Sequence, residues 1–110
     1  MSYNIILTEV FKKEAKRLIK KYVSLKKELA DLGAELKVNP TLGTPLGNDI
    51  YKIRLAISSK NKGKSGGARI ISCVKVIENN VYLVSIYNKG ERDNISDADI
   101  IIILKSEELL

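Results

Sequence analysis

The spacing of apolar side chains changes once along the chain, near residue 50, from a helical period to a period of two. Between residues 8 and 38, apolar side chains recur every three or four positions, which is typical of amphipathic helices. Between residues 51 and 87 they alternate with polar ones, which is typical of strands with one buried face. The pattern therefore predicts an α+β fold in which helices cover one face of a small antiparallel sheet.

Two helices are predicted in the first part, after a short strand over residues 3–7 that would join an edge of the sheet. Thr8 is placed to cap the first helix and Ser24 the second, and Pro40 stops the second helix. Because the connection is very short, the two should form an antiparallel hairpin. Their apolar stripes comprise Phe11, Ala15, Leu18, Ile19 and Tyr22 on the first, and Leu25, Leu29, Leu32 and Leu36 on the second.

The alternating part predicts three further strands, over residues 51–57, 68–77 and 81–87, with a hairpin turn at Asn79-Asn80. Residues 41–49, rich in Gly, Pro and Asn, are expected to be a loop, and residues 60–67 a flexible basic loop. Ser96 and Asp99 resemble a capping box, which predicts a short C-terminal helix. A strand over 100–103 is the alternative, since that run is β-branched.

With 110 residues, the chain should form a single domain spanning 1–110. It has no histidine and one cysteine, Cys73, which excludes a Ser-His-Asp triad, a histidine-ligated metal and an internal disulfide. We therefore expect no metal and no cofactor. No segment has the features of a signal peptide or a membrane span, so we expect a cytoplasmic protein without a membrane partner.

The net charge of +6 is unevenly distributed. Residues 50–77 contain no Asp or Glu, whereas the segment from Gly90 onward is acidic. A long stretch of one sign creates a field that attracts polyanions, which favours RNA as the partner. The basic residues of the acid-free stretch are Lys52, Arg54, Lys60, Lys62, Lys64, Arg69 and Lys75.

Alternation sorts the strand side chains into two faces. Ile70, Val74 and Val76, and Tyr82, Val84 and Ile86, are expected in the core beneath the helices. The opposite face should be open and cationic, without a neighbouring acid. It would carry Lys52, Arg54, Arg69, Lys75, Tyr87 and Lys89.

Such a face suits a phosphodiester. Arginine binds phosphate oxygens in a bidentate manner, and a tyrosine ring can stack on a base. In RNA the 2′-OH is a built-in nucleophile, so cleavage needs neither metal nor histidine, and arginine can stabilise the charge that develops on the phosphate.

Three stretches, YKIRLA at 51–56, GKSGGARII at 63–71 and VYLVSIYNK at 81–89, resemble the RelE/ParE toxin superfamily, most closely its RelE and HigB-type toxins. The resemblance extends over nearly the whole chain. It implies the RelE-like fold and the toxin of a type II toxin–antitoxin module, a metal-independent endoribonuclease that cleaves mRNA on the ribosome. The implied partners are a cognate antitoxin, ribosomal RNA and, for the toxin–antitoxin complex, operator DNA.

The resemblance also implies roles for matching residues. Lys52 would act as base or phosphate ligand, Arg54 and Arg69 would stabilise the transition state, and Lys89 would contact phosphate or act as acid. Tyr87 would stack on or orient a nucleotide. Further contacts to RNA or the ribosome are expected from the basic stretch itself, at Lys60, Lys62, Lys64 and Lys75.

Two other functions stay open. One is a ParE-like inhibitor of DNA gyrase, since the same fold serves both. The other is a non-catalytic module that binds RNA or the ribosome. The cationic face favours the nuclease, because inhibition of a protein does not require convergent phosphate ligands.

Overall fold

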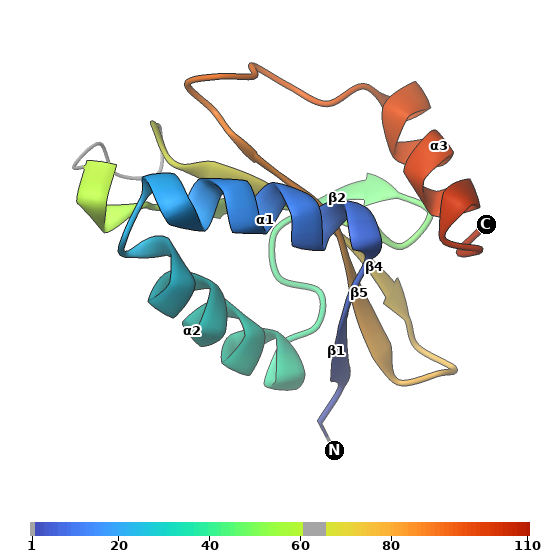
Figure 1. The fold of residues 1–110 in the computed structure, drawn as a ribbon. Helices are drawn as coiled ribbons and strands as arrows, with labels where there is room; N and C mark the ends of the chain where they lie inside the picture. The colour runs from blue at the N-terminus through green and yellow to red at the C-terminus, as the bar shows by residue number, and fades with distance from the viewer. Residues whose placement is uncertain (1, 61–65) are drawn as a thin grey trace.

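The computed structural model describes residues 2–60 and 66–110, which form a five-stranded sheet with helices packed against it (Figure 1). The strand order is β1-β5-β4-β3-β2; β1 runs parallel to β5 and the other neighbours are antiparallel. The predicted α+β architecture, with the N-terminal strand at an edge, is confirmed. The elements are β1 (Asn4–Leu7), α1 (Glu9–Lys21), α2 (Leu25–Val38), β2 (Thr44–Gly47), β3 (Ile50–Leu55), the 3-10 turn η1 (Ser58–Lys60), β4 (Ala68–Lys75), β5 (Asn80–Asn88) and α3 (Asp97–Ser106).

The N-termini of the two hairpin helices are held in different ways. The Thr8 hydroxyl accepts a hydrogen bond from Phe11 N, as predicted, and lies 3.0 Å from Leu83 O, so this cap also ties α1 to β5. Ser24 occupies the predicted N-cap position of α2, but its side chain does not cap the helix. Its backbone is already helical, with no side-chain capping bond, and its hydroxyl lies 3.0 Å from Glu28 Oε1.

The sheet has an apolar cluster on each face. On the first face α1 and α2 bury Leu18, Leu25 and Leu36 against the sheet, which confirms the predicted stripes. On the second face α3 packs Ile100 and Leu104 against the sheet. The second face was predicted to be open, and that is wrong, because the apolar residues of α3 need a surface to cover.

The predicted facing of β5 is confirmed at Ile86 and Tyr87 and is wrong at residues 82–84. Val81, Leu83 and Ile86 lie in the cluster under the hairpin, whereas Val84 lies in the cluster under α3. The cause is a β-bulge: Ile71 pairs with Ser85 and Ser72 with Leu83, so Val84 is the extra residue and the alternation shifts. Tyr82 follows Val84 to the second face.

Two predictions about the strands are wrong: where β4 ends, and that residues 41–49 contain no strand. Val76, predicted in the core, is 64% exposed because β4 ends at Lys75. Within the predicted loop 41–49, residues 44–47 form β2, an edge strand paired with β3. The Pro and Gly in this stretch predicted a loop, but an edge strand tolerates proline because one of its sides needs no hydrogen bonds.

The C-terminal segment is a helix, and the alternative of a strand is wrong. The Ser96 hydroxyl accepts from Asp99 N, as the capping pattern predicts, and Ile95 and Ile100 are buried in the same cluster. Across the described parts of the chain, none of the helices has the length and apolar character needed to cross a membrane.

Two glycines give opposite predictions for stability. A Cβ on Gly67 would collide with the backbone oxygen of Leu55, whereas a Cβ on Gly33, within α2, would have nothing within 4 Å. We expect Gly67→Ala to lower the free energy of unfolding by about 1–3 kcal/mol. We expect Gly33→Ala to raise it by roughly 0.5–1 kcal/mol, since alanine is the better helix former. Urea denaturation measures both, and a stable Gly67→Ala variant would contradict the close packing of β3 against β4.

Candidate active site

The pairing register of β3, β4 and β5 sets three of the predicted site residues side by side. Arg54 on β3 pairs with Arg69 on β4, and Arg69 pairs with Tyr87 on β5. Directly paired residues project from the same face, so these three form a line across the sheet, which we call the cationic row. Lys52 lies two positions from Arg54 and projects from the same face.

Burial differs along the cationic row. Arg54 is exposed, whereas Arg69 and Tyr87 are only 4% and 3% exposed. The Arg69 Nη1 donates to the backbone oxygen of Ala68 at 3.2 Å. A guanidinium in a protein stays charged even when it is buried, so the row combines a fixed buried charge with an accessible one.

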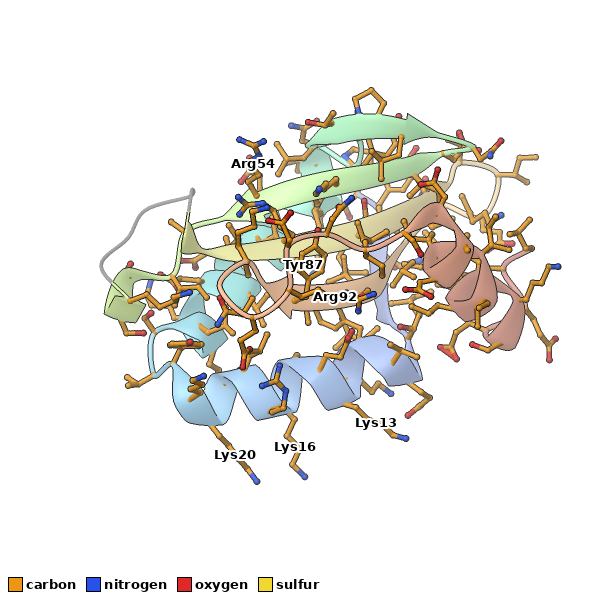
Figure 2. All side chains as sticks on the ribbon, turned by 90° about the horizontal axis from the view of Figure 1, so that it is seen from above. Lys13, Lys16, Lys20, Arg54, Tyr87 and Arg92 are labelled. Atoms are coloured by element: carbon orange, nitrogen blue, oxygen red, sulfur yellow. The ribbon has the colours of Figure 1, made fainter. Side chains whose placement is uncertain are left out.

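The segment between β5 and α3 supplies acceptors and a cation to the row. Asn94 Oδ1 accepts from Lys52 Nζ at 2.9 Å and from Tyr87 Oη at 3.4 Å. The guanidinium carbon of Arg92 lies 5.8 Å from the Tyr87 ring centroid, within cation–π distance. Figure 2 shows Tyr87 between Arg54 and Arg92. The amide of Asn94 thus holds two predicted site residues together.

Lys89, which follows β5, has an acid beside it, so the prediction of a cationic face without a neighbouring acid is wrong. Its Nζ donates to Asp93 Oδ1 at 2.8 Å and to the Asp93 backbone oxygen at 2.7 Å. The hydrogen bond from Lys89 lowers the pKa of the Asp93 carboxyl below its usual value. Lys89 is therefore partnered rather than presented to solvent alone.

The other predicted RNA contacts lie elsewhere. Lys60 Nζ donates to Asn88 Oδ1 at 2.6 Å and sits 5.3 Å from the Tyr22 ring centroid. Lys75, predicted beside the row, lies at the opposite end of β4, where its Nζ donates to Leu109 O at 3.0 Å next to α3. Lys62 and Lys64 lie outside the described residues. RNA contacts at these four lysines stay predictions.

Sequence reasoning missed Arg92, Asp93 and Asn94, because the segment they occupy has no regular period. One signal was available. The acidic residues that begin at Glu91 directly follow the last strand of a cationic sheet, and opposite charges so placed tend to pair. The structure bears this out at Asp93, which accepts from Lys89, whereas Arg92 pairs within its own part of the chain, its Nη2 donating to Asp99 Oδ2 at 2.8 Å.

The groups gathered at the row favour phosphate chemistry. Cationic side chains beside a tyrosine can bind a phosphodiester and stabilise negative charge on it. Cys73 does not add a nucleophile, since burial raises the pKa of its thiol and keeps it protonated. Within residues 2–60 and 66–110, no group of three or more His, Cys, Asp or Glu side chains is arranged to hold a metal ion.

A mixed sheet with a helical hairpin on one face and a cationic row on the other defines a small α+β protein with a cationic site on its sheet. A model of the RelE family, described as the RelE toxin of the RelE/RelB toxin–antitoxin system, matches residues 4–108. The chain belongs to this toxin family.

A solved structure, that of a double arginine-to-alanine mutant of the E. coli toxin RelE in the free state, is similar in fold. The two chains superpose with a TM-score of 0.62 at 20% sequence identity, over 99% of this chain and 96% of that one. At this level of identity the likeness supports the RelE-like fold and nothing finer.

The pairing of Lys89 with Asp93 gives a titration prediction. A depressed carboxyl pKa means that the pair is intact above the carboxyl's ordinary pKa and is lost as the pH falls through the lowered value. We expect Lys89→Gln to raise the pKa of Asp93 toward its ordinary value, as measured by NMR of the side-chain carboxyl, and Lys37→Gln to leave it unchanged. An Asp93 pKa that is the same in all three proteins would mean that the pair does not form in solution.

Proposed function

We propose that this toxin is a metal-independent endoribonuclease that cleaves mRNA on the ribosome and thereby inhibits translation. Membership of the RelE toxin family supports a toxin that is paired with an antitoxin. The observation that carries the nuclease is the register that aligns Arg54, Arg69 and Tyr87 beside Lys52. Inhibition of gyrase by surface contact would not call for such a line of phosphate-binding groups.

In the proposed reaction, the 2′-oxygen of a nucleotide attacks the adjacent phosphorus while the bond from phosphorus to the 5′-oxygen breaks. The attacking hydroxyl loses its proton and the departing 5′-oxygen gains one. Lys52 in its neutral form would take the first proton, or in its charged form would hold a phosphate oxygen. Lys89 would supply the second proton or contact the phosphate.

The arginines would act on the charge that builds up in the transition state. Arg54 is exposed and can reach a phosphate that approaches from solvent. Arg69 lies buried beside it, where the low dielectric strengthens its effect on the same phosphate. Tyr87 would orient or stack on a nucleotide, with Arg92 behind its ring.

The free protein has acceptors where RNA would bring phosphate oxygens. The amide oxygen of Asn94 takes hydrogen bonds from Lys52 and Tyr87, and the Asp93 carboxylate takes one from Lys89. The Asp93 side chain is 96% exposed, so its pair with Lys89 is weak and easily exchanged. RNA would replace these acceptors one for one.

The proposed partners follow from the same surface. A cognate antitoxin would silence the toxin by covering the cationic row with its own acceptors. The ribosome would present the message, with ribosomal RNA contacting the lysines outside the row, and the toxin–antitoxin complex would bind operator DNA. All of these partners belong to the cytoplasm, where we propose that the protein acts.

The sharpest test uses Arg54, because its exposure separates chemistry from folding. Arg54→Ala should leave stability within about 0.5 kcal/mol of the wild type. It should reduce cleavage by about a hundredfold or more, the usual cost of losing one group that stabilises the transition state. Arg69→Ala should also abolish cleavage, but a buried arginine is a poorer probe since its loss also disturbs packing. Lys26→Ala, an exposed change on α2, is the matched control and should cleave normally.

The measurement is a map of transcript 5′ ends before and shortly after tightly controlled induction in a bacterial host. New ends confined to translated regions and in register with codons, lost in Arg54→Ala and kept in Lys26→Ala, support the proposal. Growth arrest with intact transcripts and stalled replication would instead indicate a gyrase inhibitor. No arrest at all would indicate a non-catalytic module that binds RNA or the ribosome.

A further inference from the structure

The outer face of α1 is a second, separate cationic surface. The apolar stripe of the helix is buried against the sheet through Phe11, Ala15 and Leu18. The side of the helix turned away from the sheet is almost entirely basic. Its basic residues are Lys12, Lys13, Lys16, Arg17, Lys20 and Lys21, all of them exposed.

The acids of α1 do not neutralise this face. Glu14 is turned toward the sheet, where its Oε1 accepts from Ser85 Oγ at 2.9 Å and from Ile86 N at 3.2 Å. Glu9 lies in the first turn and pairs with Lys12 at 3.4 Å. Beyond that first turn, the outer side of α1 has no carboxylate of its own.

One acid from outside the helix reaches the surface. Glu91 pairs with Arg17 at 3.2 Å and with Lys21 at 3.4 Å, and its hydrogen bond from Arg17 lowers the pKa of the Glu91 carboxyl. Lys13, Lys16 and Lys20 have no hydrogen bond or ion pair with any residue of the described ranges 2–60 and 66–110. We call these three residues the lysine face.

This arrangement works against the stability of the helix. Lys16 and Lys20 are four residues apart, and Lys13 is three from Lys16, spacings at which like charges repel. Acids placed at such spacings would have stabilised α1, as the Lys27–Asp31 pair does on α2. Lys13 to Lys20 spans about 10 Å along the helix at 1.5 Å per residue, so the face covers two turns. An anionic partner would relieve the repulsion within this array.

We propose that the lysine face binds the phosphate backbone of structured RNA, independently of sequence. This proposal rests on the proposed function in one respect: if the toxin acts on the ribosome, the structured RNA would be ribosomal RNA. Lysine ammonium groups are compact charges suited to phosphate contact without the fork geometry that reads a particular group. A protein partner fits less well, because the centre of a protein interface is depleted of charge and α1 exposes no large apolar side chain.

The lysine face and the cationic row can be occupied at the same time. Figure 2 shows Lys13, Lys16 and Lys20 pointing away from the sheet, while Arg54 lies on the far side of the strands from α1. RNA along α1 would therefore not block a message at the row. Binding at two sites of one molecule raises the effective concentration of the second partner, so the lysine face would anchor the toxin while the row engages the message.

The test compares two triple variants of the full chain that lose the same charge. The first is Lys13→Gln, Lys16→Gln and Lys20→Gln; the control is Lys26→Gln, Lys27→Gln and Lys37→Gln on α2. Glutamine keeps the helix propensity, and circular dichroism checks that both variants fold. Binding to a short RNA duplex of arbitrary sequence, without ribosomes, is followed by fluorescence anisotropy over a series of salt concentrations.

We expect the α1 variant to bind the duplex about tenfold more weakly or worse, with the slope of log K against log salt reduced by about two to three. The α2 control should stay near the wild type in both. Equal loss in both variants would show that net charge alone matters, and unchanged binding in the α1 variant would remove the site. Polyglutamate serves as a second probe. If the α1 variant keeps its RNA binding but loses binding to polyglutamate, the lysine face would be assigned to an acidic protein instead. These outcomes are independent of cleavage, so intact transcripts after induction would overturn the proposed nuclease and leave the duplex result standing.

Discussion

Strand β4 lies in the middle of the sheet, hydrogen-bonded to β3 along one edge and to β5 along the other. Seven of its eight residues are buried, because the hairpin covers one face and α3 the other. Burial on both faces fixes the register, since a slip of one residue would exchange the two apolar sets. Arg69 is the charged residue in this buried run, and its position sets where Arg54 and Tyr87 stand. The geometry of the cationic row is thus a consequence of how β4 is packed.

Much of this arrangement is readable from the sequence, and the exceptions have physical causes. The helical stripes, the Thr8 and Ser96 caps and the shared face of Arg54 and Arg69 follow from local periodicity and hydrogen bonding. The bulge at Val84 cannot be predicted in this way. A bulge places two residues of one strand opposite one residue of its neighbour, and this depends on how the two strands pair rather than on the sequence of either. Strand β2 was missed for a related reason: its Pro- and Gly-containing stretch forms an edge strand only because it pairs with β3.

The burial of Arg69 and Tyr87 was missed because alternation assigns a face but does not say what covers it. Two distant parts of the chain provide the cover, α3 and the segment that carries Asn94. In neither part does the spacing of apolar residues indicate that it packs against β4. Residues on β3 and β5 that share a face could be identified, whereas the irregular segment that contacts them could not, and Arg92, Asp93 and Asn94 all lie there.

The acidic residues after β5 link the two cationic surfaces in the free protein. Glu91 pairs with Arg17 and Lys21 on α1, two residues before Asp93 pairs with Lys89 at the end of β5. Exposed pairs of this kind each stabilise a fold little, and salt weakens them. They hold the segment in place, but phosphate groups could displace their carboxylates easily. Under the proposed function, the net positive charge would steer the molecule toward RNA before any specific contact forms.

The proposed mechanism makes the RNA's own 2′-oxygen the nucleophile, while the cationic row positions the message and stabilises the charge on its phosphate. It is tested most directly with a synthetic message programmed into purified ribosomes, in which the single nucleotide before the scissile phosphate is replaced by its 2′-deoxy form. We predict that the toxin cleaves the all-ribose message at that phosphate, leaves the 2′-deoxy message intact there, and still binds both complexes equally. Cleavage of the 2′-deoxy message at the same position would require another nucleophile and would contradict the mechanism.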